Sequence, residues 1–151
     1  MIRKVDRSAL VPYSAKDMFA LVADVEAYPS FLPWCSDVDV HSRDGDTVEA
    51  TLELRRGNLS KRFRTRNVMT PPERMDLALV DGPFRHLSGG WRFTSLGAQG
   101  SKVSLVLEFE FDSRLLDLLI GAYFEDICNK LVDAFTRRAR EVYGPHHKRR
   151  D

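Results

Sequence analysis

The middle of the chain alternates apolar and polar residues with a period of two, which is typical of β-strands in a sheet. One later segment has the helical period and is long enough to cover one face of that sheet. The alternation is clearest over residues 47–54 and 103–111, where one face is apolar and the other mostly polar. A sheet with one apolar face must bury that face against another layer. The sequence therefore predicts an α+β fold, in which a curved antiparallel sheet of six or seven strands wraps around a long C-terminal helix.

Proline residues, cap residues and short turn sequences mark where the elements begin and end. Residues 2–11 predict a first strand, which Pro12 ends, and a short amphipathic helix follows with Ser14 as its N-cap. Residues 27–34 are dense in aromatics and prolines and predict a brief helical turn. The last helix is expected to begin after Ser113 and to run for roughly 30 residues. Turns between strands are predicted at residues 44–46, 56–58, 71–73, 81–83 and 97–100.

Length and composition indicate one globular domain. The 151 residues are 43% hydrophobic and 30% charged, with a formal net charge of +1. The domain is expected to span residues 1–144, and the basic residues 145–151 to be disordered. The N-terminus lacks the apolar stretch of a secretory signal, and residues 118–124 are too short to span a bilayer. We therefore expect a cytoplasmic protein, or one peripheral to the inner membrane, with its two cysteines reduced.

A helix lying across a concave sheet either encloses an apolar cavity or packs the interior solid. The pattern alone favours the solid core, because inward aromatic residues more often belong to a core than to a pocket. Trp91 and Phe93 share one face of a predicted strand, and Gly89 beside them removes bulk. That glycine either widens a cavity or marks a β-bulge, and the bulge is the simpler interpretation.

Residue types used in catalysis are present, but not in catalytic patterns. The histidines show no metal-ligand spacing with the cysteines, and no nucleophile motif or glycine-rich phosphate loop occurs. Asp37 with Asp39, and Glu108 with Glu110, most simply face solvent. We therefore expect neither an enzyme nor a metal site.

Several segments, in order, resemble one family across almost the whole chain. They are residues 28–35, 63–67, 80–84, 89–93, 109–111, 134–139 and 141–143. This set is similar to the START-like coenzyme Q-binding family of the polyketide cyclase-like superfamily, which includes the bacterial ribosome association toxins of the RatA type.

The resemblance implies a helix-grip fold of the START and Bet v 1 type, with a tunnel for ubiquinone or a similar isoprenoid lipid. The implied role is that of a carrier or chaperone that supports respiratory electron transport. The alternative is a RatA-type toxin that binds the large ribosomal subunit and blocks subunit joining. Residues 28–35 resemble the family's entrance motif, although they could equally form a corner that plugs the sheet. The residues expected to line the cavity are Phe31, Leu32, Trp34, Leu54, Phe63, Leu79, Phe84, Trp91, Phe93, Leu105, Phe109, Leu119, Tyr123 and Ile127.

A cluster of cations on one predicted strand is the second candidate site, formed by Lys61, Arg62, Arg64 and Arg66. The three arginines share the face opposite Phe63 and form an outward row. Cross-strand pairing with outward glutamates, such as Glu49 and Glu53, is the simplest interpretation. Contact with anionic lipid headgroups or ribosomal RNA is the alternative, and no DNA contact is expected.

Overall fold

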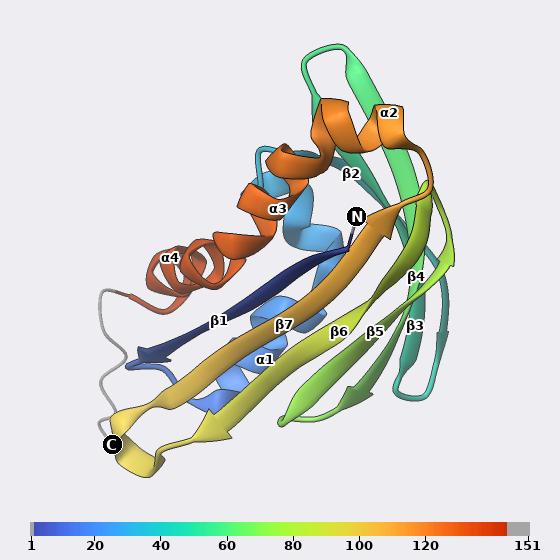
Figure 1. Ribbon diagram of the computed structural model, residues 1–151. Helices are drawn as coiled ribbons and strands as arrows, with labels where there is room; N and C mark the ends of the chain where they lie inside the picture. Colours follow the sequence, from blue (N-terminus) through green and yellow to red (C-terminus); the bar gives the residue numbers. More distant parts are fainter. Residues whose placement is uncertain (1, 145–151) are drawn as a thin grey trace.

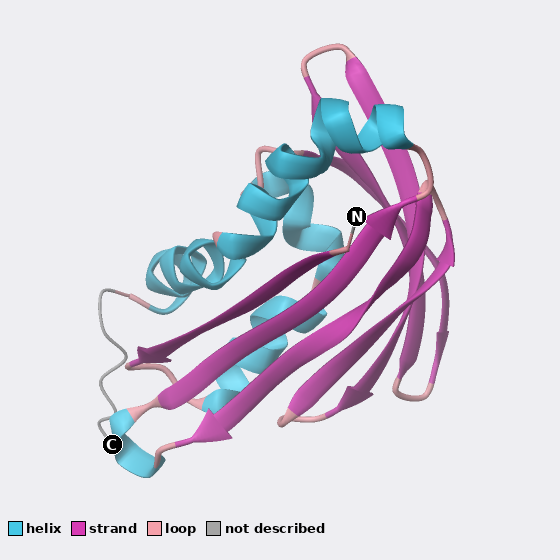
Figure 2. Ribbon diagram, viewed as in Figure 1, coloured by secondary structure: helices cyan, strands magenta, loops and turns pink. Residues whose placement is uncertain are grey.

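The computed structural model describes residues 2–144, in which seven antiparallel strands form one sheet in the order β1-β7-β6-β5-β4-β3-β2. Strands β2 to β7 form a meander, and β1 pairs with β7 at one edge. Figures 1 and 2 show that the sheet is strongly curved and that the helices lie on its concave side. The predicted fold class is confirmed, whereas the expectation for the basic residues 145–151 lies outside the described residues. The strands are β1 (Arg3–Val11), β2 (Cys35–Asp44), β3 (Thr47–Arg56), β4 (Leu59–Thr70), β5 (Arg74–Asp81), β6 (Phe84–Ser95) and β7 (Ser101–Phe111).

Two short helical elements connect β1 to β2. The predicted cap of α1 (Ala15–Ala23) is confirmed, because the Asp17 backbone N–H donates to Ser14 Oγ at 3.0 Å. The 3-10 helix η1 (Val25–Ser30) supplies the predicted helical turn and begins two residues earlier than expected. A second 3-10 turn, η2 (Gly97–Gln99), connects β6 to β7.

The C-terminal helical segment spans residues 114–143, so its predicted start and length are confirmed, but it is divided rather than one regular α-helix. It consists of α2 (Arg114–Leu116), the π-helical η3 (Asp117–Gly121), α3 (Ala122–Asn129) and α4 (Leu131–Tyr143). Lys130 breaks the ladder between α3 and α4, because its backbone N–H donates to the carbonyl of Ile127, three residues back, at 3.0 Å. Periodicity does not detect this break because the apolar stripe continues across it. Figure 1 shows the segments bending along the concave side, with α2 at one end of the sheet.

The interior beside β6 and β7 is packed with phenylalanine rings. Phe84 stacks on Phe111 with ring centroids 4.6 Å apart, and Phe109 meets Phe124 edge-on at 4.9 Å. Gly89 neither widens a cavity nor marks a bulge, since it lies in regular register opposite Leu107. Its φ is +142°, and a Cβ there would lie 2.0 Å from the Val106 carbonyl oxygen. Glycine is therefore needed because the neighbouring strand approaches too closely for a side chain.

An ion-pair cluster ties the first strand to the C-terminal helix. Arg3 donates from Nε to Asp117 at 3.0 Å and from Nη1 to Glu125 at 2.7 Å. The side chain of Arg3 is only 15% exposed, so these charges are only weakly screened by solvent. The guanidinium holds the pKa of Asp117 below its ordinary value by hydrogen bonding.

We expect Arg3→Met to lower the free energy of unfolding at pH 7 by about 1–3 kcal/mol, as for hydrogen bonds to charged groups. Because the pKa of Asp117 is lowered in the folded state, the stabilisation is present above the unfolded carboxyl pKa and is lost as pH falls. The difference between variant and wild type should therefore narrow below about pH 4. Urea unfolding of both proteins between pH 7 and pH 3 measures this difference in the free energy of unfolding.

Arg7→Met is the matched control, because Arg7 on the same strand donates to the neutral amide oxygen of Asn129 at 2.9 Å. Its effect should change little over the same pH range. If the difference in free energy of unfolding between Arg3→Met and wild type stays constant down to pH 3, the Arg3–Asp117 ion pair is not the source of this stabilisation.

Candidate functional site

A cavity of about 80 Å³ lies between the concave face of the sheet and helices α3 and α4. Side chains from η1, from the sheet strands β3 to β7 and from both helices line it. Sites for drug-sized ligands have volumes of about 300–1,000 Å³. A lipid could therefore enter only if side chains of the wall moved apart.

The structure places the fourteen expected lining residues in three different environments. Those that line the cavity are Leu32, Trp34, Phe63, Trp91 and Ile127. Those buried elsewhere in the core are Leu54, Phe84, Phe93, Leu105 and Phe109. Those that lie outside the cavity and are half-buried or exposed are Phe31, Leu79, Leu119 and Tyr123. Contact of any of them with a ligand stays a prediction.

The π-helical turn explains why two of these residues face outward. A π-turn carries one residue more than an α-helical turn, so it rotates the residues around it relative to a regular helical stripe. Leu119 is 49% exposed whereas its neighbour Ile120 is 1% exposed. Tyr123 packs under the Arg56 guanidinium, and its hydroxyl donates to the Arg55 carbonyl at 3.2 Å.

Several lining residues were not among those expected from the sequence. The cavity is also lined by Tyr28, Phe124, Cys128 and Phe135, and by the polar residues Thr65 and Asn67 of β4. Burial raises the pKa of the Cys128 thiol, so this thiol is protonated at neutral pH. The sequence could have predicted that Thr65 and Asn67 point inward, because both alternate along the strand with the outward arginines.

The second cysteine, Cys35, lies at the start of β2 and is also free and buried. Its thiol donates to the Asp37 carbonyl oxygen at 3.7 Å. Burial raises the pKa of this thiol to about 11, which keeps it protonated and unreactive near neutral pH.

The predicted cluster of cations on β4 divides between the two faces of the sheet. Arg62, Arg64 and Arg66 lie on the convex face, as their alternation with buried Phe63 predicts. Lys61 lies on the concave side, because its partner across the strand pair is the buried Leu54. The outward row therefore consists of the three arginines.

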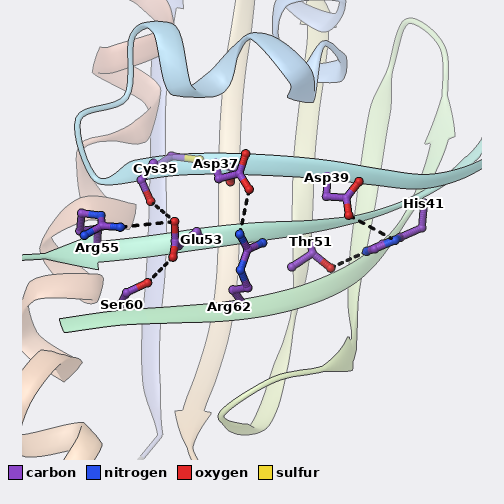
Figure 3. A network of polar contacts seen from close by, with 10 residues as sticks. Cys35, Asp37, Asp39, His41, Thr51, Glu53, Arg55, Ser60 and Arg62 are labelled. Carbon is purple, nitrogen blue, oxygen red and sulfur yellow. Dashed lines mark hydrogen bonds and ion pairs between the residues drawn. The ribbon is translucent and has the colours of Figure 1, made fainter. Parts of the chain in front are cut away.

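Carboxylates on β3 and β2 pair with all three arginines. Arg64 and Arg66 both contact Glu49, at 2.8 and 2.7 Å, and lower its pKa by hydrogen bonding. Arg62 instead reaches across β3 to Asp37 on β2, at 2.8 Å (Figure 3). The cross-strand pairing expected from the sequence is confirmed for Glu49.

Glu53 does not form a close ion pair with this row, although it faces Arg62 across the strand pair. Its carboxylate accepts hydrogen bonds from Ser60 (Figure 3) and from Ser36, and both bonds lower its pKa. The convex face around β4 is therefore a network of paired charges rather than a bare cationic patch.

Within residues 2–144, no group of three or more histidine, cysteine or acidic side chains could hold a metal ion. No helix in the same range is long and apolar enough to cross a membrane.

Comparison with known sequences shows relatives along almost the whole chain. Residues 11–136 match the family model for polyketide cyclase, dehydrase and lipid transport proteins. The chain is 46% identical over 143 residues to the ribosome association toxin RatA of Vibrio cholerae, covering 95% of this chain and 99% of that protein. It is 31% identical over 144 residues to the mitochondrial coenzyme Q-binding protein of Drosophila melanogaster, covering 92% of this chain and 59% of that protein.

Solved structures share the same fold. A solution structure of an 18 kDa protein from Caulobacter crescentus has a TM-score of 0.74 and 33% identity, and the match covers 94% of this chain and 99% of that one. The Zhui aromatase/cyclase from Streptomyces has a TM-score of 0.82 at 18% identity, covering 94% and 96%. At that identity the cyclase shows the fold alone. The chain belongs to the polyketide cyclase, dehydrase and lipid transport family, and within it to the START-like group that contains the RatA and coenzyme Q-binding proteins.

Proposed function

We propose that this protein associates with the ribosome in a non-catalytic role, as a toxin of the RatA type that blocks joining of the subunits. The observation that carries the proposal is the 46% identity to the Vibrio cholerae toxin over 99% of that protein's length. The coenzyme Q-binding relative is 31% identical and is matched over 59% of its length. Ribosome association is therefore better supported than the quinone-carrier role that the family resemblance implied.

The convex face of β4 has the chemistry to contact ribosomal RNA. An arginine has five N–H donors, and the ion pairs with Glu49 and Asp37 leave some of them available. All three arginines of the row are more than one third exposed. Phosphate contacts made by such side chains give affinity without sequence recognition.

We expect the triple variant Arg62→Gln, Arg64→Gln, Arg66→Gln to co-sediment more weakly with purified large ribosomal subunits. Each lost phosphate contact should also reduce the dependence of affinity on salt. The measurement is a sedimentation titration between about 50 and 200 mM salt.

Arg74→Gln is the control for this experiment, because Arg74 is an exposed, ion-paired arginine on the neighbouring strand β5. If wild-type protein does not co-sediment at low salt, ribosome association is wrong. If the triple variant binds like Arg74→Gln, the surface has been assigned incorrectly.

The cavity supports a second candidate function, the binding of ubiquinone or a related isoprenoid lipid. Its wall is almost entirely apolar, and the Drosophila relative is named for coenzyme Q binding. The two functions are compatible, because the cavity and the convex face are opposite surfaces of the sheet. The volume of about 80 Å³ means that a bound lipid must displace side chains of the wall.

We expect protein purified from a quinone-containing host to release an isoprenoid quinone into organic solvent. Trp34→Ala should reduce the retained quinone several-fold, because Trp34 lines the cavity. Tyr123→Ala is the matched aromatic control, since that ring packs against Arg56 outside the cavity. Mass spectrometry of the extracts measures the quinone retained by each protein. Circular dichroism confirms that both variants are folded. Absence of bound lipid, together with no uptake of added quinone, would remove this function.

A further inference from the structure

Two polar side chains interrupt the apolar wall of the cavity. Thr65 and Asn67 are successive inward positions on β4 and are 6% and 3% exposed. Both line the cavity, and Thr65 Oγ1 donates to Asn67 Oδ1 at 2.9 Å. Their partners in register on β3 and β5 are apolar.

The hydrogen-bonding capacity of Asn67 is only partly used. A side-chain amide has one oxygen acceptor and two N–H donors. The bond from Thr65 occupies Oδ1, and no group in residues 2–144 accepts a side-chain hydrogen bond from Nδ2. Every fully buried side-chain nitrogen or oxygen in that range has a partner. Nδ2 therefore keeps some accessible surface, and Asn67 is one of the residues that line the cavity.

We propose that Asn67 donates a hydrogen bond from Nδ2 to a carbonyl or ether oxygen of a neutral, otherwise apolar ligand. This inference rests on the proposed ligand-binding role of the cavity. Thr65 acts as a positioning residue, because its bond to Oδ1 fixes which end of the amide faces the cavity.

The rest of the wall excludes charged ligands. No charged side chain lines the cavity, and burial of an ionised carboxylate or phosphate without a partner is strongly unfavourable. The hydroxyl of Tyr28 is already used, since it donates to the Val22 carbonyl. The chemistry of the wall therefore fits a quinone or ketone on a hydrocarbon chain rather than a fatty acid.

Asn67→Leu tests this assignment because leucine keeps the approximate volume and removes the donors. We expect its affinity for a short-chain ubiquinone to fall about 10-fold, the loss of roughly one hydrogen bond. Its affinity for an isoprenoid hydrocarbon without oxygen should be unchanged, and its melting temperature should not fall. Thr65→Val should show a smaller loss for the quinone and none for the hydrocarbon.

Met75→Leu is the control, since Met75 also lines the cavity and the exchange conserves volume. If Asn67→Leu and Met75→Leu bind the quinone equally well, the role of Asn67 is wrong although the cavity still binds lipid. If wild-type protein binds neither probe, the ligand-binding function itself fails. Preference for palmitate over ubiquinone would overturn the assignment of a neutral ligand.

An independent observation concerns the end of the sheet covered by α2 and η3 (Figure 1). Leu115, Leu118 and Leu119 are 63%, 82% and 49% exposed there. Arg56, at the end of β3, donates to the Leu119 carbonyl oxygen at 3.2 Å, and Arg114 precedes the first leucine. We call these three leucines and two arginines the tip.

We infer that the tip docks on an anionic lipid bilayer. Neither Arg56 nor Arg114 has an ion pair with a carboxylate in the described part of the chain. Exposed leucines beside cations that have no carboxylate partner match the bilayer interface, where apolar side chains enter the acyl boundary and cations contact anionic headgroups. RNA would satisfy the cations but would give the leucines no apolar layer.

Leu118→Glu should reduce partitioning onto phosphatidylglycerol-containing vesicles at least 10-fold, because it places a negative charge at the most exposed leucine. Leu10→Glu is the matched control, since Leu10 is 73% exposed at the opposite end of β1 from Arg3. Vesicle flotation measures both. Equal partitioning of the two variants would contradict the inference, as would loss of ribosome co-sedimentation by Leu118→Glu with vesicle binding retained.

Discussion

The structure depends on a mismatch of shapes, because a long C-terminal helical segment, with α1 and η1 beside it, must cover the concave face of a curved seven-stranded sheet. A straight helix would leave the ends of a curved sheet exposed. The break at Lys130 and the π-turn of η3 let the segment follow the curvature. The ion pairs of Arg3 with Asp117 and Glu125 then hold the helix against β1. Phenylalanine rings fill the space beside β6 and β7, and the space left between α3, α4 and the remaining strands is the cavity.

The alternation of residues predicted the sheet well, because the buried residues of β3, β4 and β7 lie on one face of each strand and a period of two reports that directly. The helix was less predictable. Its apolar stripe continues through Lys130, so the break leaves no trace in the pattern. The π-turn rotates Leu119 to the surface by inserting one residue into a turn. Both features arise from packing against the sheet, and local sequence carries little information about them.

The cavity wall was predicted only in part, because inward direction does not distinguish a cavity from a solid core. Phe63 and Phe109 both point inward from strands, yet only the first lines the cavity. Thr65 and Asn67 were not expected in the wall because they are polar, although they alternate along β4 in phase with Phe63 and so lie on the same face. On the convex side, Asp37 pairs with Arg62 across an intervening strand. A bulge in β2 between Cys35 and Asp37 sets that position.

The two proposed functions meet on one strand. β4 carries Phe63, Thr65 and Asn67 on its concave face, and the arginine row alternates with them on its convex face. A shift of β4 by one residue relative to its neighbours would turn every arginine inward and every cavity residue outward. The pairing of β4 with β3 runs without a bulge from Leu59 to Val68, so a single register positions both surfaces. Ligand chemistry inside and polyanion contact outside therefore depend on the same backbone hydrogen bonds, although no side chain is shared between them.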